Sequence, residues 1–290
     1  MYDRLLFPTD GSDPAREALG YALDVAAEHD ATLHVLNVAD TNQDSLTTVE
    51  GRVVDVLESE GEDLVAEAVG RARARGIDAV SAVLQGDPTL TIVDYAHEHA
   101  DLVVMPTHGR RGLSRLLLGS VTERVVGALD VPVVVVNPAA DRTHRYPPRE
   151  ILAATDGSDA AGRALDAAVD VACETGATLR VLSVVETTSL GFDVRSAVAS
   201  EELDARATAV LDAAAARATE RGVDTVTHVA HGHPHREILD ALDDHAVDLL
   251  ALGVHGETDF SRSVLGGVAT KVLRTSPVPV LLRRDPDPGA

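Results

Sequence analysis

The chain has 290 residues, and 47 acidic side chains outnumber 25 basic ones, of which one alone is a lysine. The net charge of −22 argues against nonspecific nucleic-acid binding, which depends on basic surface. With one cysteine, no basic and apolar leader, and no apolar run near the roughly 20 residues of a membrane span, the sequence predicts a soluble cytoplasmic protein without an internal disulfide.

Short apolar runs alternate with segments of helical periodicity along the first half of the chain. The runs predict strands over residues 4–9, 33–38, 77–84, 102–105 and 131–136. The periodicity predicts helices over residues 15–29, 89–99 and 120–129, and a long helix that follows the polar stretch 40–49 and ends near residue 75. This order predicts a doubly wound parallel sheet with helices on both faces and a core of Val, Leu and Ala.

The second half of the chain repeats the first. "TDGSD" occurs at Thr9–Asp13 and again 146 positions later, and the segments 10–38 and 156–184 agree at 18 of 29 positions. Self-similarity at this period indicates tandem domains rather than a solenoid of short repeats. We predict a first domain over 1–138, a linker over 139–148, a second domain over 149–284 and a tail over 285–290.

Both copies place glycine-rich loops at carboxyl ends of predicted strands, where doubly wound folds bind ligands. Gly119-Ser120 and Gly266-Gly267 open helices, and the free N–H groups there favour an anion. The same glycines would also serve as plain loop residues or helix caps. The sequence contains no Walker A loop, no dinucleotide fingerprint, no metal-ligand spacing and no Gly-x-Ser-x-Gly elbow.

On these motifs the chain resembles a tandem member of the universal stress protein family. The opening strands end in "PTDGSD" and "AATDGSD", a Gly-x-Pro precedes the third helix, and the last strand is of the type "VPVVVV". The ATP-binding branch of the family follows Gly-x2-Gly-x9-Gly-Ser/Thr. The copies here keep the spacing but read Pro106-x2-Gly109-x9-Gly119-Ser120 and Gly253-x2-Gly256-x9-Gly266-Gly267, so each departs at one position.

The resemblance implies two five-stranded domains of the adenine nucleotide alpha hydrolase-like fold and a set of nucleotide-binding residues. By matching positions, Asp10 and Asp156 would reach ribose or adenine, and Val38 and Val184 would line the base pocket. Backbone N–H groups would hold phosphates at four glycines, Gly109, Gly119, Gly256 and Gly266, with Gly253 in the same loop and a hydroxyl from Ser120. For both aspartates the alternative is local capping of the next helix, which Ser12 or Asp13 could also provide.

The function that the resemblance implies is a stress-response regulator that binds ATP, with Mg²⁺ carried on the nucleotide, and does not turn it over. No residue pattern positions a general base or an attacking water, so we do not expect an enzyme. A scaffold with degenerate sites, favoured by Pro106 and Gly267, and an ATP-consuming enzyme of the same fold are the alternatives.

Three further expectations concern assembly, asymmetry and salt. Terminal strands of this family commonly mediate dimers, so we expect the apolar strands 131–136 and 278–282 to pair the two domains about a pseudo-twofold axis, while dimerisation of whole chains stays open. The segment 107–120 carries Arg110, Arg111 and Arg115, whereas 254–267 carries Arg262, Glu257 and Asp259, so we expect the first domain to be the better ATP site. The acidic, lysine-poor composition predicts a halophilic protein whose stability rises toward molar salt.

Overall fold

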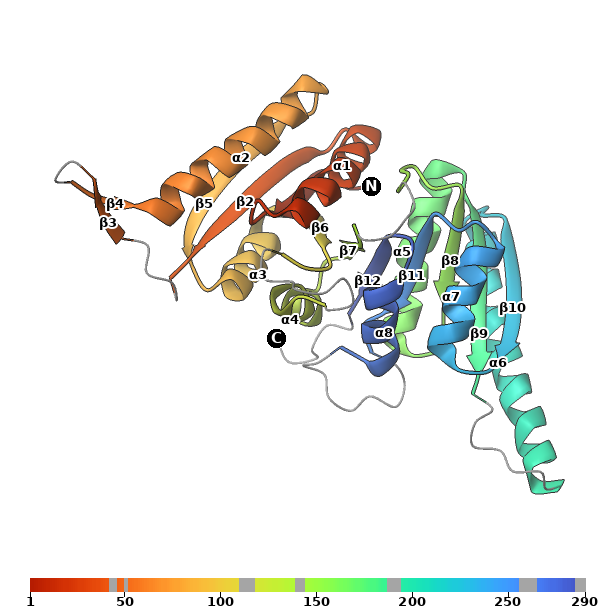
Figure 1. Ribbon diagram of the computed structural model, residues 1–290. Helices are drawn as coiled ribbons and strands as arrows, with labels where there is room; N and C mark the ends of the chain where they lie inside the picture. The colour runs from red at the N-terminus through yellow and green to blue at the C-terminus, as the bar shows by residue number, and fades with distance from the viewer. Residues whose placement is uncertain are drawn as a thin grey trace. The chain divides into compact units, whose positions relative to one another are not determined.

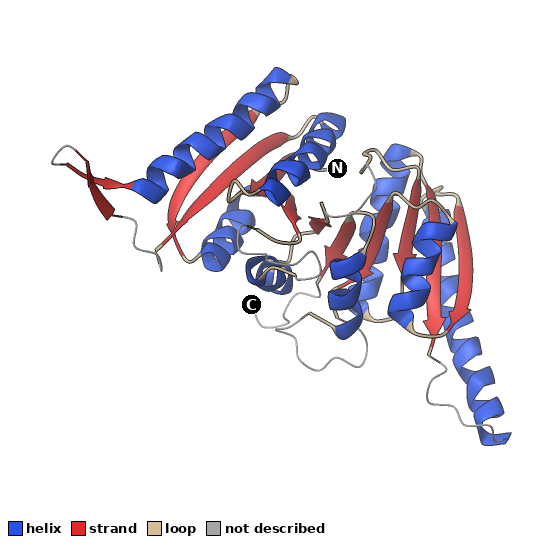
Figure 2. Ribbon diagram, viewed as in Figure 1, coloured by secondary structure: helices blue, strands red, loops and turns tan. Residues whose placement is uncertain are grey.

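The computed structural model describes residues 1–41, 46–49, 52–109, 118–138, 144–186, 194–255 and 265–284. It forms two compact units, one of residues 2–139 and the other of residues 140–290. Each is described separately below, and Figures 1 and 2 show the same alternation of strands and helices in both.

The first unit is a doubly wound α/β domain. Its parallel sheet has the order β5-β2-β1-β6-β7 and consists of β1 (Arg4–Pro8), β2 (Thr32–Asp40), β5 (Ala79–Gly86), β6 (Leu102–Pro106) and β7 (Val133–Val136). Its helices are α1 (Asp13–His29), α2 (Val56–Ala74), α3 (Pro88–His99) and α4 (Ser120–Ala128). The predicted elements are thus confirmed, with ends that shift by a few residues.

The second unit repeats this arrangement in the order β10-β9-β8-β11-β12. Its strands are β8 (Glu150–Ala154), β9 (Thr178–Val185), β10 (Thr225–His231), β11 (Leu249–Gly253) and β12 (Val280–Arg283). Its helices are α5 (Asp159–Thr175), α6 (Val194–Glu220), α7 (Pro234–Asp244) and α8 (Gly267–Thr275). Two five-stranded parallel domains were predicted, and both are confirmed.

Among the described residues, a hairpin precedes the long helix α2 of the first domain, and no hairpin precedes the matching helix α6 of the second domain. It consists of β3 (Leu46–Val49) and β4 (Arg52–Asp55), which pair antiparallel. The sequence indicated only a polar, helix-poor stretch over 40–49, and the hairpin was not predicted. In the second domain the long helix α6 begins where the chain is next described, at Val194.

Helices cover both faces of each sheet, as the alternation predicts. In the first domain α1 and α2 share one face, because the Arg75 guanidinium on the loop after α2 contacts the Asp24 carboxylate of α1 at 2.6 Å. Helices α3 and α4 pack together over the other face. The same link recurs in the second domain, where Arg221 contacts Asp170 of α5 at 2.8 Å.

The core is aliphatic, as the near-absence of aromatic residues predicts. The largest side chains that are almost fully buried are those of Phe7, Leu5, Leu6, Leu23, Leu33, Leu36, Leu102, Leu129, Ile151, Leu152, Leu179 and Leu182. Most lie on the first two strands of each domain, where helices cover the sheet from both sides. No helix in the described part of the chain is long and apolar enough to cross a membrane.

Candidate functional site

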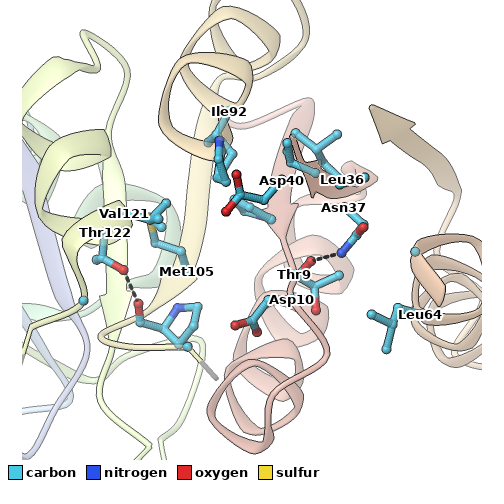
Figure 3. A pocket seen from close by; sticks show the side chains of 18 of the residues that line it. Thr9, Asp10, Leu36, Asn37, Asp40, Leu64, Ile92, Met105, Val121 and Thr122 are labelled. Carbon is cyan, nitrogen blue, oxygen red and sulfur yellow. Dashed lines mark hydrogen bonds between the residues drawn. The ribbon is translucent and has the colours of Figure 1, made fainter. Parts of the chain in front are cut away.

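A cavity of about 430 Å³ opens at the carboxyl ends of β1, β2 and β6 in the first domain. This volume lies within the range of small-molecule sites, roughly 300–1,000 Å³. Figure 3 shows side chains from the loop after β1 and from β2, β6, α2 and α3 around one space. Five residues proposed from the sequence all line it: Asp10, Val38, Gly109, Gly119 and Ser120.

The loop after β1 is built around Asp10. The Asp10 Oδ1 accepts a hydrogen bond from the Ser12 N–H at 3.0 Å, and the Ser12 hydroxyl oxygen accepts one from Ala15 N–H at 3.3 Å to cap α1. The other carboxylate oxygen faces Gly109, where a Cβ atom would collide with it. Half-buried Asp10 therefore orders the turn and lines the cavity, while the cap of α1 is Ser12, as the alternative interpretation allowed. The contact of Asp10 with a ligand stays a prediction.

Asn37 ends the pairing between β1 and β2. Its side-chain amide donates to the Thr9 carbonyl at 2.8 Å, and the register of the two strands stops at Pro8 opposite Leu36. Alternate residues of a strand point their N–H and C=O groups to the same side. The N–H and C=O groups of Val38 therefore point in the same direction as those of Leu36, but beyond the end of β1, where they face the cavity. A backbone N–H and C=O in that position match the hydrogen-bonding edge of a base.

Helix α2 closes the cavity on one side through a glycine in its interior. A Cβ atom at Gly61 would lie 2.5 Å from Asn37 Oδ1, so only glycine lets α2 approach β2 this closely. Leu64 from the next turn of the helix lines the cavity and packs against Gly11. We did not identify Asn37, Gly61 or Leu64 from the sequence; a glycine inside a helical pattern was the signal that could have found Gly61.

The start of α4 forms one end of the cavity. Gly119 is the N-cap residue, without a side-chain cap, and its own N–H donates to Thr107 C=O at 2.7 Å. The N–H groups that remain for a ligand are therefore those that follow, beginning with Ser120. The Thr122 hydroxyl donates to the Pro106 carbonyl at 3.0 Å and so links the first turn of α4 to the end of β6.

The described charged side chains around the cavity are acidic. Asp10, Asp40 and Glu60 line it, and no arginine or lysine lies among the described lining residues. The arginines on which we based the ranking of the two sites fall in 110–117, outside the described residues. His108 is buried, and its Nδ1 lies 3.0 Å from the Thr107 hydroxyl, which agrees with a loop-ordering role.

The second domain repeats the first loop but differs around it. Asp156 Oδ1 accepts from Ser158 N–H at 3.0 Å, as in the first copy, yet Asp156 is exposed. Gly266 caps α8 and donates to Val254 C=O at 2.9 Å, while Gly256 lies outside the described residues. Val184 lies on β9 at the position that Val38 has on β2.

Gly253 serves close packing in the second domain. A Cβ atom there would lie 2.7 Å from the Ala161 backbone nitrogen, so the first turn of α5 sits directly against the end of β11. Pro106 occupies the matching position in the first domain and has side-chain atoms, so α1 cannot come as close to β6. Pro106, where the sequence departs from the family pattern, is itself one of the residues that line the first cavity.

Within the described residues no three His, Cys, Asp or Glu side chains are grouped so that they could hold a metal ion. The chemistry of the first cavity is that of a binding site: carboxylate acceptors, a free backbone edge, apolar walls and a helix N-terminus. These features lie at the carboxyl ends of a doubly wound sheet, where such folds bind ligands.

The comparisons with known proteins agree with this class of fold. The Universal stress protein family profile matches residues 1–137 and again 148–284, so the chain belongs to that family as a tandem member. Universal stress protein MJ0531 of Methanocaldococcus jannaschii is 36% identical over 140 residues, which cover 47% of this chain and 82% of that protein. Universal stress protein Rv2005c of Mycobacterium tuberculosis is 30% identical over 240 residues, 78% of each chain.

Solved structures show the same architecture over the whole chain. A universal stress protein from Archaeoglobus fulgidus superposes with a TM-score of 0.74 and 25% identity, covering 98% of this chain and 96% of that one. Another universal stress protein was solved in complex with cAMP; it is 29% identical, covers 48% of this chain and 99% of its own, and has a TM-score of 0.38.

Proposed function

We propose that the protein is a stress-response regulator whose first domain binds ATP or a related adenine nucleotide without significant turnover. The observation that carries this proposal is the cavity in which Asp10, the Val38 backbone edge and the start of α4 converge. Family membership supports the stress-response part, because the relatives are named universal stress proteins.

The cavity offers a different chemistry to each part of a nucleotide. Apolar side chains from α2, α3 and β6, namely Leu64, Ile92 and Met105, provide walls for a flat base. The Asp10 carboxylate is an acceptor for ribose hydroxyls, and its own acceptor role toward Ser12 holds it in place. Backbone N–H groups at the start of α4 favour the phosphates, with Mg²⁺ carried on the nucleotide.

The absence of turnover is proposed because the sequence contains no residue pattern that positions a general base or an attacking water. His108 is buried and engaged with the Thr107 hydroxyl. The second domain supports the alternative function, a scaffold or interaction module, at its own site. There Gly253 serves packing and Asp156 lies at the surface, so we propose that the first domain is the better nucleotide site.

Titration calorimetry with ATP in high salt tests the proposal. Asp10→Ala should weaken binding about 10- to 100-fold, because a hydrogen bond to a charged group contributes about 1.5–3 kcal/mol. Asp10→Asn keeps the acceptor for Ser12 N–H, so its effect on binding measures the contribution of the negative charge alone. Asp156→Ala is the matched control in the second domain and should leave the tighter site intact.

Two outcomes would overturn the proposal. If Asp156→Ala abolishes binding and Asp10→Ala does not, the second domain holds the nucleotide. A phosphate-release assay run alongside should show no turnover, and release on the order of 1 s⁻¹ would establish an enzyme instead.

A further inference from the structure

The outer edge of the first domain is an uncharged strand. Strand β5, Ala79–Gly86 with the sequence AVSAVLQG, is the edge of its sheet and contains neither a charged residue nor a proline. Exposed edges are normally blunted by charge, proline or short length, because their unpaired backbone groups template pairing with another chain. An eight-residue edge without these devices stands out in a chain of net charge −22.

The geometry of β5 determines which groups face outward. Leu33 N–H donates to the Asp78 carbonyl at 2.8 Å and Thr41 N–H to the Gly86 carbonyl at 3.3 Å, so even-numbered residues bond to β2. The backbone groups of the odd-numbered residues therefore point to the open edge. These residues are Ala79, Ser81, Val83 and Gln85.

Two large apolar side chains of the same strand are exposed on the sheet face away from α2. The Val83 side chain faces α2, since it lies 3.0 Å from a Cβ atom placed on Gly61, so even-numbered side chains point to the other face. On that face Val80 is 45% and Leu84 38% exposed. Both would be covered if a further strand were added to β5.

We propose that two copies of the protein associate through antiparallel pairing of β5 with β5 of the second copy. With the twofold axis at Ala82, Ser81 pairs with Val83 of the other copy through outward-facing backbone groups, and Ala79 lies opposite Gln85 of the other copy. The same register sets Val80 directly opposite Leu84 of the other copy, so the exposed apolar side chains cover each other.

Helix α2 carries opposite charges near the two ends of β5, and the twofold axis brings each charge of one copy close to the opposite charge of the other. Exposed Glu58 reaches one end of β5, where its carboxylate accepts from the Gln85 amide at 3.4 Å. Exposed Arg73 reaches the other end, where its guanidinium donates to the Ala79 carbonyl at 3.5 Å. Because Ala79 lies opposite Gln85 of the other copy, Arg73 of each copy meets Glu58 of its mate, which argues for a second copy rather than an unrelated chain.

The corresponding edge of the second domain lacks this complementarity. Strand β10 has Val226 and Ala230 where β5 has Val80 and Leu84, and Ala230 is buried. At one end Asp204 already contacts His231 at 2.7 Å, and at the other Thr219 stands where the first domain has its arginine. We therefore assign the contact between copies to the first domain.

Sedimentation velocity on the full chain tests the proposal, independently of any nucleotide. The wild type should sediment as a dimer at a protein concentration of about 100 µM. Ser81→Pro should be a monomer with an unchanged melting temperature, since the Ser81 N–H makes no bond within its own sheet and an edge proline is tolerated. The matched change Thr227→Pro on β10 should leave the dimer intact.

Charge reversal supplies a test that does not depend on proline. Glu58→Arg and Arg73→Glu should each weaken the dimer at the lowest salt that keeps the protein folded, and the double variant should restore it. A monomeric wild type, a dimer that survives Ser81→Pro, a dimer lost equally with Thr227→Pro, or a double variant without recovery would each refute the proposal.

Discussion

The two ligand-site regions of this protein share a backbone design and differ in the side chains around it. Both first loops use Thr, Asp and Ser in the same hydrogen bonds, with matching distances of 3.2, 3.0 and 3.3 Å. Around that loop, Asn37 and Gly61 of the first domain are replaced by Ser183 and Ala207, and Pro106 by Gly253.

The comparison shows that the hydrogen bonds of the turn are the same in both domains, while the side chains packed beside the turn differ. Asn37 with Gly61 combines a larger residue with the smallest one at a helix–strand contact, whereas Ser183 and Ala207 are two small residues at the matching positions. Such exchanges preserve packing, since cores tolerate changes that conserve volume. They also move polar groups, so the same fold presents a different surface to a ligand in each domain.

Gly253→Ala should have the largest effect on stability. The new Cβ would press on the Ala161 backbone nitrogen at 2.7 Å, and backbone cannot move aside cheaply, so we expect a loss of about 3 kcal/mol, the upper range for overpacking. Denaturant unfolding measures it. The control Gly162→Ala, whose Cβ would meet only the Arg217 guanidinium at 3.5 Å, should be neutral or stabilising. Equal effects of the two changes would show that Gly253 is not a packing residue.

Gly61→Ala should destabilise the first domain by about 1–2 kcal/mol, because the clash with Asn37 Oδ1 exceeds the gain in helix propensity. Adding Asn37→Ser recreates the pair found in the second domain and should recover most of the loss. A double-mutant cycle in urea measures the coupling. If the two changes in stability were strictly additive, residues 37 and 61 would not be coupled, and the proposed exchange between the two pairs would be wrong.

Asp87→Ala should cost about 1 kcal/mol, the usual value of an N-cap. Its carboxylate accepts from Thr89 N–H at 2.9 Å and Leu90 N–H at 3.1 Å at the start of α3. His233 has the same position before α7 but makes no side-chain cap bond, so His233→Ala should cost less. Thermal melts of the two variants would contradict this view if His233→Ala were the more damaging.

The smallest effect concerns pH. Burial, followed by the nearby His99 and Arg4, lowers the pKa of His34, whose Nδ1 lies 3.1 Å from the Tyr95 hydroxyl. The unfolded chain then takes up a proton more readily than the folded one, so stability should fall as pH drops below about 6.5. His34→Gln should reduce the loss between about pH 7.5 and pH 5.5. At the position of His34 the second domain has Arg180, paired with Glu150 at 2.8 Å, and so lacks the histidine on which this contribution depends.

Much of the first site could be predicted from the sequence because its residues follow strand ends and fixed loop spacings. Asp10, Val38, Gly109, Gly119 and Ser120 were proposed by matching positions with the family that the sequence resembles, and all five line one cavity. Asn37 and Gly61 could not be found so, because their role depends on a contact between a strand and a helix that lie far apart in the chain. The pairing of the two domains, the halophilic character and the domain boundaries stay predictions.

The sequence by itself determined the duplication, the order of strands and helices, and the turn chemistry of both loops, because these rest on periodicity and on local hydrogen bonds. Only the tertiary structure decided that Gly253 packs against a helix, that the Thr122 hydroxyl links α4 to the end of β6, and that β5 leaves an uncharged edge. Those outcomes depend on how closely separate elements approach, and approach distances are set by side chains that are distant in sequence.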